Sequence, residues 1–258
     1  MNVASTCFFA EDWPVFYEDN HLLALYKPSG LLVQADQTGD PSLLELAKTW
    51  VKYRYQKPGR VYLGIVHRLD RPVAGVLLFA RTSKAAGRLS EQFRTGGVEK
   101  QYMAVVEGVV KPPANQLIHH LERGSGKHGR GTSSRIAAAP TKKSRDARLS
   151  YQVLDTYQSR SLVAIELETG RHHQIRVQFS HIGHPVVGDL RYGAPHPLPE
   201  KQIALCATQL GVRHPTRGNT VRFVLPYPRG WPWPGLGDRP DAPPWNWSLI
   251  FPKVCNRL

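Results

Sequence analysis

His67-Arg68-Leu69-Asp70-Arg71-Pro72-Val73-Ala74-Gly75 is the stretch that decides the fold of this chain. It lies between two short apolar runs, at residues 61–66 and 76–80, each of a length typical of a buried strand. We therefore expect a fixed turn between two strands. Its one carboxylate, Asp70, lies among three cationic or titratable side chains, so its pKa should be lowered. Rigidly presented loop residues are often functional, although composition by itself favours a surface ion pair.

The composition indicates a folded protein with a polyanionic partner. At 258 residues the chain can form one sizeable core or two small ones. The 34 Lys and Arg residues outnumber 20 Asp and Glu residues, which gives a net charge of +14. Such a charge favours nucleic acid over a membrane as the partner. The three cysteines form no C-x-x-C motif, which argues against a disulfide framework or a zinc knuckle.

Nothing in the sequence predicts export or membrane insertion. Residues 1–11 lack the basic start and apolar core of a signal peptide. No apolar run approaches the roughly 20 residues that a membrane-spanning helix needs. We therefore expect a cytoplasmic protein.

Hydrophobic periodicity predicts strands and helices on both sides of the central turn. Ser42 and Glu45 fit a capping box at the start of a helix that ends before Pro58, and Thr82 or Ser83 can cap a second helix. The remaining expected elements are strands at 15–17, 22–26, 99–107, 203–212 and 221–225, a hairpin over 147–157 and 162–167, and a helix that contains Ile175, Phe179 and Ile182.

Two residues in these elements are candidates for the site. Tyr102 projects from the strand at 99–107, where its ring could line a cleft or simply pack. Arg176 falls in the first turns of its helix, where the helix dipole favours anions rather than cations. A carboxylate partner from elsewhere in the fold would explain this arginine.

Residues 123–148 concentrate positive charge. Eight basic residues and one acid give +7, half of the net charge of the chain. The basic residues are Arg123, Lys127, Arg130, Arg135, Lys142, Lys143, Arg145 and Arg148. Since the segment shows neither helical nor strand period, we expect a mobile basic loop that grips a phosphate backbone, with an inert solvated loop as the alternative.

Residues 226–258 hold eight of the 21 prolines and four of the six tryptophans. Little periodicity remains there, so we expect an irregular C-terminal tail. Trp231, Trp233, Trp245 and Trp247 could stack on bases, although covering a sheet edge is the simpler role. The chain then reads as one catalytic domain over residues 1–225 with a tail over 226–258.

Common catalytic motifs are absent from the sequence. It contains no H-E-x-x-H, no P-loop, no G-x-G-x-x-G and no G-x-S-x-G. The histidines at 172, 173, 181 and 184 lie close in sequence, but no Cys or Asp completes a metal set with them. The remaining candidate chemistry is a single carboxylate, without metal or cofactor, that faces a polyanion.

The chain resembles the RluA-type RNA pseudouridine synthases over residues 15–225. Five motifs in the family's order carry the resemblance, and together they are far more specific than any one of them. They are Leu25-Tyr26-Lys27-Pro28-Ser29-Gly30-Leu31-Leu32-Val33, His67-Arg68-Leu69-Asp70-Arg71, Glu99-Lys100-Gln101-Tyr102-Met103-Ala104-Val105-Val106-Glu107-Gly108, Glu168-Thr169-Gly170-Arg171-His172-His173-Gln174-Ile175-Arg176 and His184-Pro185-Val186-Val187-Gly188-Asp189.

The resemblance implies isomerisation of uridine to pseudouridine in RNA. It implies that Asp70 attacks or deprotonates the ribose, that Tyr102 stacks on the flipped uracil and that Arg176 pairs with Asp70. It also implies that Arg68 fills the gap left by the flipped nucleotide and that Leu205 packs under the base. The implied fold is α+β, with a mixed, largely antiparallel sheet, flanking helices and a central cleft.

The resemblance also sets expectations for substrate and assembly. We expect structured RNA, 23S rRNA or tRNA, as the partner of a monomer without cofactor or membrane contact. The family pattern begins near Val15, so we expect no N-terminal S4-like domain. Without that domain, we expect Lys142, Lys143 and Arg145 of the basic loop to be the residues that bind the RNA. Two competing classes are a catalytically silent RNA-binding protein and a glycosidase, but a glycosidase would need a second acid beside Asp70.

This sequence departs from the family pattern at several positions. Val73-Ala74-Gly75 replaces a common Thr-Ser-Gly, and Gln178 and Cys206 replace common histidines. The loss of hydroxyl groups leaves the hydrogen bonds around the Asp70 turn in question.

Overall fold

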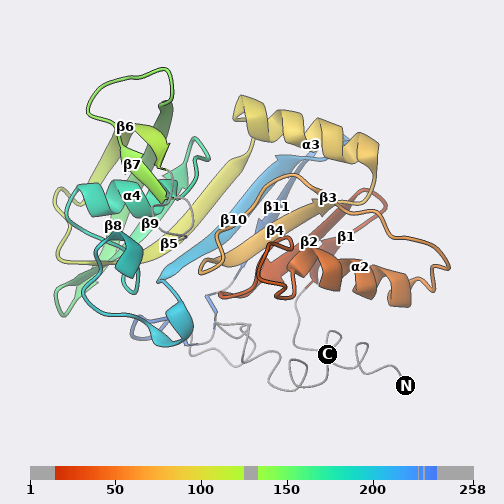
Figure 1. The fold of residues 1–258 in the computed structure, drawn as a ribbon, viewed down its shortest axis with the longest axis horizontal. Coiled ribbons are helices and arrows are strands. Elements are labelled where there is room, and N and C mark those ends of the chain that lie inside the picture. Colours follow the sequence, from red (N-terminus) through yellow and green to blue (C-terminus); the bar gives the residue numbers. More distant parts are fainter. Residues whose placement is uncertain (1–14, 125–132, 226, 229, 237–258) are drawn as a thin grey trace. The chain divides into compact units, whose positions relative to one another are not determined.

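The computed structural model describes residues 15–124, 133–225, 227–228 and 230–236. The chain forms two compact units, each described here by itself. The first comprises the chain up to residue 98 and again from residue 207 onward, and the second comprises residues 99–206. Figure 1 labels their elements.

The sheet of the first unit contains four antiparallel strand pairs: β1 with β2, β2 with β4, β3 with β4, and β10 with β11. Its strands follow the order β1-β2-β4-β10, with β3 paired to β4 and β11 paired to β10. The strands are β1 (Val15–Glu18), β2 (Leu22–Lys27), β3 (Gly64–Ile65), β4 (Ala74–Ala80), β10 (Leu205–Arg213) and β11 (Thr220–Val224). Every residue of β2 and β4 is buried, which explains why both segments are continuous apolar runs rather than alternating ones.

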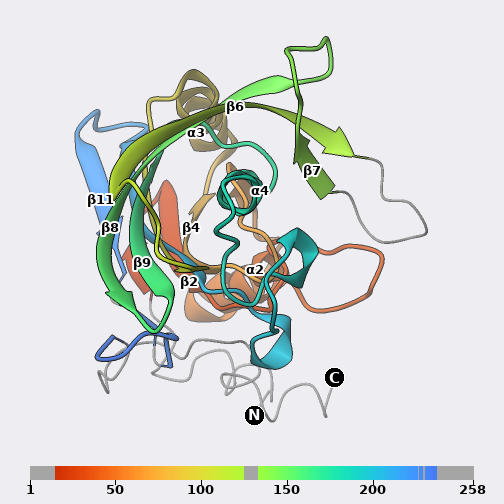
Figure 2. The ribbon, with the colours of Figure 1, turned by 90° about the vertical axis from the view of Figure 1, so that its left-hand side faces the viewer.

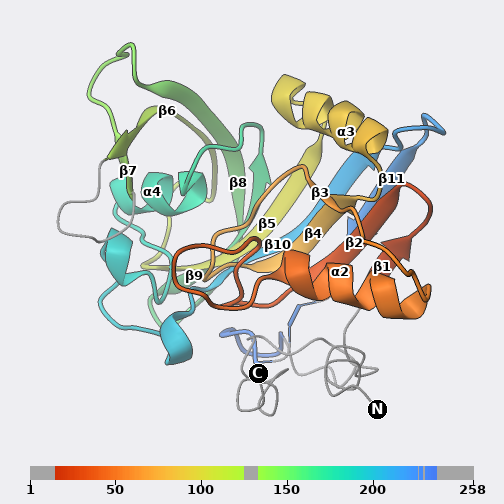
Figure 3. The same cartoon turned by 45° about the vertical axis from the view of Figure 1, so that its right-hand side comes forward.

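Two capped helices complete the first unit. The Oγ atom of Ser42 accepts a hydrogen bond from the Glu45 amide at the start of α2 (Leu43–Arg54), and Thr82 does the same for Ala85 in α3 (Ser83–Thr95). Gly96 ends α3 in the left-handed region, with φ of +80°. Figure 3 shows α2 alongside β1 and β2, and α3 near β3, β4 and β11. Both helices were predicted from the sequence.

The second unit is an antiparallel sheet that curves around one helix. Its strands are β5 (Glu99–Glu107), β6 (Ala114–Gly124), β7 (Ser133–Ile136), β8 (Arg145–Tyr157) and β9 (Arg160–Leu167), in the order β5-β9-β8-β6-β7. Helix α4 (Gln174–His181) lies inside the curve formed by β6, β8 and β9 (Figure 2). Two short 3-10 helices follow, η2 (Leu190–Tyr192) and η3 (Pro199–Lys201).

The predicted hairpin of the second unit is confirmed. The turn between β8 and β9 places Gln158 and Ser159 at φ of +48° and +60°, the left-handed pair that a tight two-residue hairpin turn requires. Strand β5 spans residues 99–107 as predicted. The mixed α+β fold with a largely antiparallel sheet is therefore confirmed.

Three expectations from periodicity differ from the structure. Within 61–66 only Gly64 and Ile65 pair as a strand. The segment 123–148 is not one loop, because its described part holds β7 and the start of β8, and part of it (125–132) lies outside the described residues. Strand β6 was not predicted at all. These strands form by pairing with distant partners, and their exposed polar faces give the sequence little period.

The predicted division into a domain at 1–225 and a tail at 226–258 stays a prediction. Trp231 and Trp233 are buried. Trp245 and Trp247 lie outside the described residues.

Asp19 holds the turn between β1 and β2 together with the turn after β10. Its carboxylate accepts hydrogen bonds from the His21 and Leu22 amides and contacts the buried His214 ring at 2.7 Å. Burial alone would raise the pKa of Asp19, but the hydrogen bonds from His21, His214 and Leu22 outweigh burial and lower it from 3.8 to about 2.

This shift predicts a pH-dependent contribution to stability. Because the pKa is lower in the folded state, the contribution of about 2 kcal/mol is present above pH 4 and is lost as the pH falls towards 2. We expect Asp19→Asn to lower the free energy of unfolding by about that amount at pH 7 and by clearly less near pH 3. Urea denaturation of both proteins at the two pH values measures this, and a pH-independent difference would contradict it.

Candidate functional site

The turn that carries Asp70 is held against the turn between β2 and α2. The Gly30 amide donates to the Arg71 carbonyl at 2.8 Å, and the Ser29 hydroxyl donates to the Pro72 carbonyl at 2.7 Å. Within the turn, the Val73 amide donates to the carbonyl of Asp70 at 3.0 Å. The backbone that follows Asp70 is thus held by three hydrogen bonds.

Lys27 forms the centre of this arrangement. Its ammonium group is fully buried and donates to the carbonyls of Pro28, Leu31 and Arg71 at 3.0, 2.8 and 3.2 Å. A buried ammonium is tolerated only where its donors are satisfied, so the three carbonyls must stay where they are. Lys27 therefore fixes the two turns to each other.

The other residues near Asp70 have separate structural partners. Arg71 donates from Nε to the Gly30 carbonyl at 3.0 Å and pairs with Asp40 at 2.7 Å. The Nε2 atom of His67 accepts a hydrogen bond from the Leu78 amide at 2.9 Å, and its ring stacks on Phe93. Arg68 is exposed.

The turn does not depend on the hydroxyl groups that this sequence lacks. Val73 and Ala74 are buried apolar residues, and backbone hydrogen bonds hold the turn. Gly75 has φ of +140°, and a Cβ atom there would lie 2.5 Å from the Ala207 backbone. Only glycine allows this close approach between β4 and β10.

The remaining predicted site residues lie in the second unit. Tyr102 is half-buried on β5, opposite Ile165 of β9. Leu205 is buried at the first residue of β10. Arg176 is buried in the first turn of α4. Asp70 and Arg68 belong to the first unit, so this placement leaves the predicted pairing of Arg176 with Asp70 a prediction.

Arg176 has a carboxylate partner that the sequence did not identify. Its Nε and Nη2 atoms donate to the two carboxylate oxygens of Asp189 at 2.6 and 2.9 Å, with the side chains 5% and 2% exposed. The guanidinium also lies over the Tyr192 ring, 5.0 Å from its centroid. Asp189 is the last residue of the motif at 184–189 that carries the family resemblance. An acid in this turn-rich connector was the feature of the sequence that could have indicated it as the partner of Arg176.

Tyr192 ties this ion pair to β7. Its hydroxyl accepts a hydrogen bond from the Ser134 amide at 2.9 Å and contacts the His173 ring nitrogen Nδ1 at 2.8 Å. Ser180 donates to the Tyr192 carbonyl at 2.6 Å. The guanidinium of Arg176 is thus fixed by a bidentate acid on one side and an anchored ring on the other.

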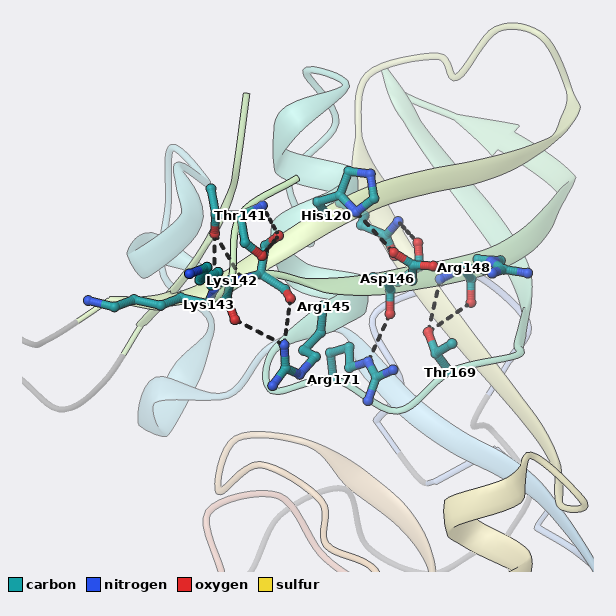
Figure 4. Close-up of polar contacts among 12 residues, drawn as sticks. His120, Thr141, Lys142, Lys143, Arg145, Asp146, Arg148, Thr169 and Arg171 are labelled. Atoms are coloured by element: carbon teal, nitrogen blue, oxygen red, sulfur yellow. Dashed lines mark hydrogen bonds and ion pairs between the residues drawn. The ribbon is translucent and has the colours of Figure 1, made fainter. Parts of the chain in front are cut away.

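The predicted RNA-binding residues Lys142, Lys143 and Arg145 lie exposed at the turn before β8 and at its first residue (Figure 4). Hydrogen bonds between Thr141 and Ser144 close this turn. The guanidinium of Arg145 donates to the carbonyls of residues 142 and 144. Their positive charges are therefore presented from a structured turn rather than from an open loop.

The part of the chain that the structure describes contains no group of three or more His, Cys, Asp or Glu side chains that could hold a metal ion. Among the described residues, no helix is long and apolar enough to cross a membrane.

Comparisons with known proteins identify the family of this chain. Residues 21–181 match the family model for RNA pseudouridylate synthases. The chain is 33% identical over 227 residues to the ribosomal large subunit pseudouridine synthase D of Xanthomonas campestris pv. campestris, which covers 83% of this chain and 66% of the relative. It is 39% identical over 172 residues to an uncharacterized RNA pseudouridine synthase of Chloroflexus aurantiacus, which covers 66% of this chain and 52% of that protein.

A solved structure gives the same result for the fold. The human RNA pseudouridylate synthase domain containing 4 matches with a TM-score of 0.69 and 25% identity, over 84% of this chain and 89% of that one. The family model covers more than half of the chain and includes Asp70, Tyr102 and Arg176. The chain therefore belongs to the RNA pseudouridylate synthase family.

Proposed function

We propose that this protein isomerises uridine to pseudouridine in structured RNA, with Asp70 as the catalytic carboxylate. The observation that carries the proposal is the position of Asp70 inside the family match, on a turn locked by the buried ammonium of Lys27. A carboxylate that attacks a ribose carbon or removes a ribose proton must be positioned precisely, which requires a rigid backbone. The hydrogen-bonded turn at Asp70 is such a backbone.

The other site residues would serve a flipped nucleotide. Uracil inside a stacked helix is out of reach, so it must leave the stack and be held on an aromatic face. Tyr102 would provide that face, Leu205 would pack under the base, and Arg68 would fill the gap in the RNA. Arg176 would pair with Asp70 and keep it ionised.

The reaction is balanced without an added group. The N-glycosidic bond breaks, the uracil rotates, and a carbon–carbon bond to the same ribose forms, so no atom is gained or lost. The pocket must therefore retain the detached uracil and exclude water. We propose that the reaction needs no cofactor.

The basic surface would bind the RNA backbone. The Xanthomonas relative is named for the large ribosomal subunit, and we extend that substrate class, 23S rRNA with tRNA as the second candidate, to this chain. Lys142, Lys143 and Arg145 are exposed on the turn before β8, where they could contact phosphates. A cytoplasmic monomer would suffice for this activity.

Asp189 would act as a positioning residue for Arg176. It engages both Nε and Nη2 of the guanidinium, which fixes the plane of the group. Loss of the carboxylate would leave Arg176 buried and charged without its acid partner.

The catalytic assignment predicts that Asp70→Asn abolishes activity. We expect the rate of pseudouridine formation in a substrate transcript to fall at least about 100-fold, since acid–base catalysis contributes at least that much. RNA binding should persist. The matched control is Asp40→Asn, an exposed acid that pairs with Arg71 beside the same turn, which should keep most of the activity. Wild-type conversion by Asp70→Asn would rule out the assignment.

The RNA-binding assignment predicts a change in salt dependence. Replacing Lys142, Lys143 and Arg145 by Ala should weaken RNA binding and lower the slope of log K against log salt by about 2 to 3. A control that removes the same charge from the same unit, at Lys111, Arg160 and Lys201, should leave the slope nearly unchanged. An unaltered slope in the first triple variant would remove these residues from the interface.

The role of Asp189 predicts a combined loss of stability and activity. Asp189→Asn should lower the free energy of unfolding by about 3–5 kcal/mol, because it removes the bidentate carboxylate from a buried arginine. Glu91→Gln, which breaks the exposed pair with Arg94, should cost at most about 1 kcal/mol. Urea denaturation measures both. Activity is measured at a temperature where Asp189→Asn stays folded. The first-order rate of pseudouridine formation at saturating RNA should then fall by a larger factor than the affinity for RNA does. An unchanged rate would show that Asp189 has a purely structural role.

A further inference from the structure

We propose that Lys100 and Arg171 together bind one phosphate group of the RNA backbone, an inference that rests on the proposed action on RNA. Lys100 is the second residue of β5, and Arg171 lies just before α4. Both belong to the second unit. Both lie in motifs that carry the family resemblance, but neither was predicted as a site residue.

Neither cation has an acid partner among the described residues. The ammonium of Lys100 donates to the Glu168 carbonyl at 3.3 Å, and the Nε atom of Arg171 donates to the Asp146 carbonyl at 2.8 Å. Main-chain carbonyls satisfy donors but do not neutralise charge. Both positive charges therefore remain uncompensated within the described fold.

The nearby acids are already engaged. The Asp146 carboxylate contacts the His120 ring at 3.0 Å and Arg148 at 3.3 Å (Figure 4). The Glu168 carboxylate accepts a hydrogen bond from Gln116 at 2.6 Å. Among the described residues, neither of these carboxylates pairs with Lys100 or Arg171, which leaves both cations open to an anion from a bound RNA.

The Lys100 ammonium lies against the loop that carries Arg171: it is 3.3 Å from the Glu168 carbonyl and 3.9 Å from the position that a Cβ atom on Gly170, the neighbour of Arg171, would take. Burial lowers the pKa of the Lys100 ammonium, and the positive charge of Arg171 lowers it further. A fold that keeps like charges together against this repulsion is relieved by a bound anion.

The backbone around Arg171 is rigid, which favours a preformed site. The Arg171 amide donates to the side-chain oxygen of buried Gln174 at 3.0 Å, and the amide group of Gln174 donates to the Arg148 carbonyl at 3.0 Å. Thr169 donates to the same Gln174 oxygen at 2.8 Å and accepts from the Arg148 amide at 2.9 Å. The loop is thus tied to β8 and to α4 at once.

The position of the site connects it to the basic surface already described. In Figure 4 the guanidinium groups of Arg145 and Arg171 lie on the same side of β8. Arg145 likewise donates only to carbonyls. A guanidinium fork next to a compact ammonium suits the several oxygens of a phosphodiester, and a continuous RNA strand could place successive phosphates along these residues.

The test measures RNA binding by wild type, Lys100→Met, Arg171→Gln and the double variant over a series of potassium chloride concentrations. The probe is an RNA hairpin transcript. Because both cations would neutralise one phosphate, we expect the double variant to lower the slope of log K against log salt by about 0.7–0.9, and not by twice that. Arg171→Lys, which keeps the charge, should retain most of the slope.

The control is Arg160→Gln, at the opposite end of β9, where the arginine pairs with Glu107. It should leave the slope unchanged. Lys100→Met keeps the apolar stem and removes a buried charge, so its thermal melting temperature should not fall, which separates binding from folding. Inorganic phosphate, added in place of chloride at constant ionic strength, should not displace the RNA from wild type; displacement would indicate a site for free phosphate.

The outcomes separate this inference from the proposed function. A wild-type slope in the double variant, while wild type still forms pseudouridine, would overturn the phosphate site alone. A reduced slope without any pseudouridine formation by wild type would overturn the function and leave the phosphate site standing. An equal loss of slope in Arg160→Gln would also refute the site, because the effect would then be one of net charge.

Discussion

The buried ammonium of Lys27 is the interaction on which the Asp70 turn depends. Three carbonyls from two separate turns converge on it, and one of them belongs to Arg71, the neighbour of Asp70. Moving the Asp70 turn away would remove the Arg71 carbonyl from the acceptors of this buried charge, which is unfavourable. The position of the acid is therefore set by a lysine more than 40 residues earlier in the chain.

Three cations of this protein are in three different physical situations. Lys27 is buried and satisfied by carbonyls, Arg176 is buried and neutralised by Asp189, and Arg171 is tied to a carbonyl but not neutralised. The first two stabilise the fold. The third leaves charge available to a ligand, which is why we infer phosphate binding there and not at Lys27 or Arg176.

Much of the site was predictable because its residues lie in local patterns. The turn at Asp70 follows from two apolar runs, and the helix with Arg176 follows from Ile175 and Phe179 with a glycine stop at residue 183. The position of Arg176 on that helix also predicted a carboxylate partner, since no helix dipole favours a cation there. The sequence did not identify Asp189 as the partner, because the connector between the two residues has no period and the motif that ends in Asp189 was the available signal.

The sequence by itself determined the motif order, the family, the capped helices and the fact that one acid lies among cations. Each of these can be recognised from residues that lie within a few positions of one another in the sequence, because covalent geometry limits the spacing of their side chains and their local hydrogen bonds. Only the tertiary structure decided that β7 and the start of β8 lie within the basic segment, that Lys27 contacts the Asp70 turn, and that Lys100 contacts the loop at 168–170 just before Arg171. Those features arise from pairing between residues distant in the chain, and side-chain spacing along the chain carries no information about them.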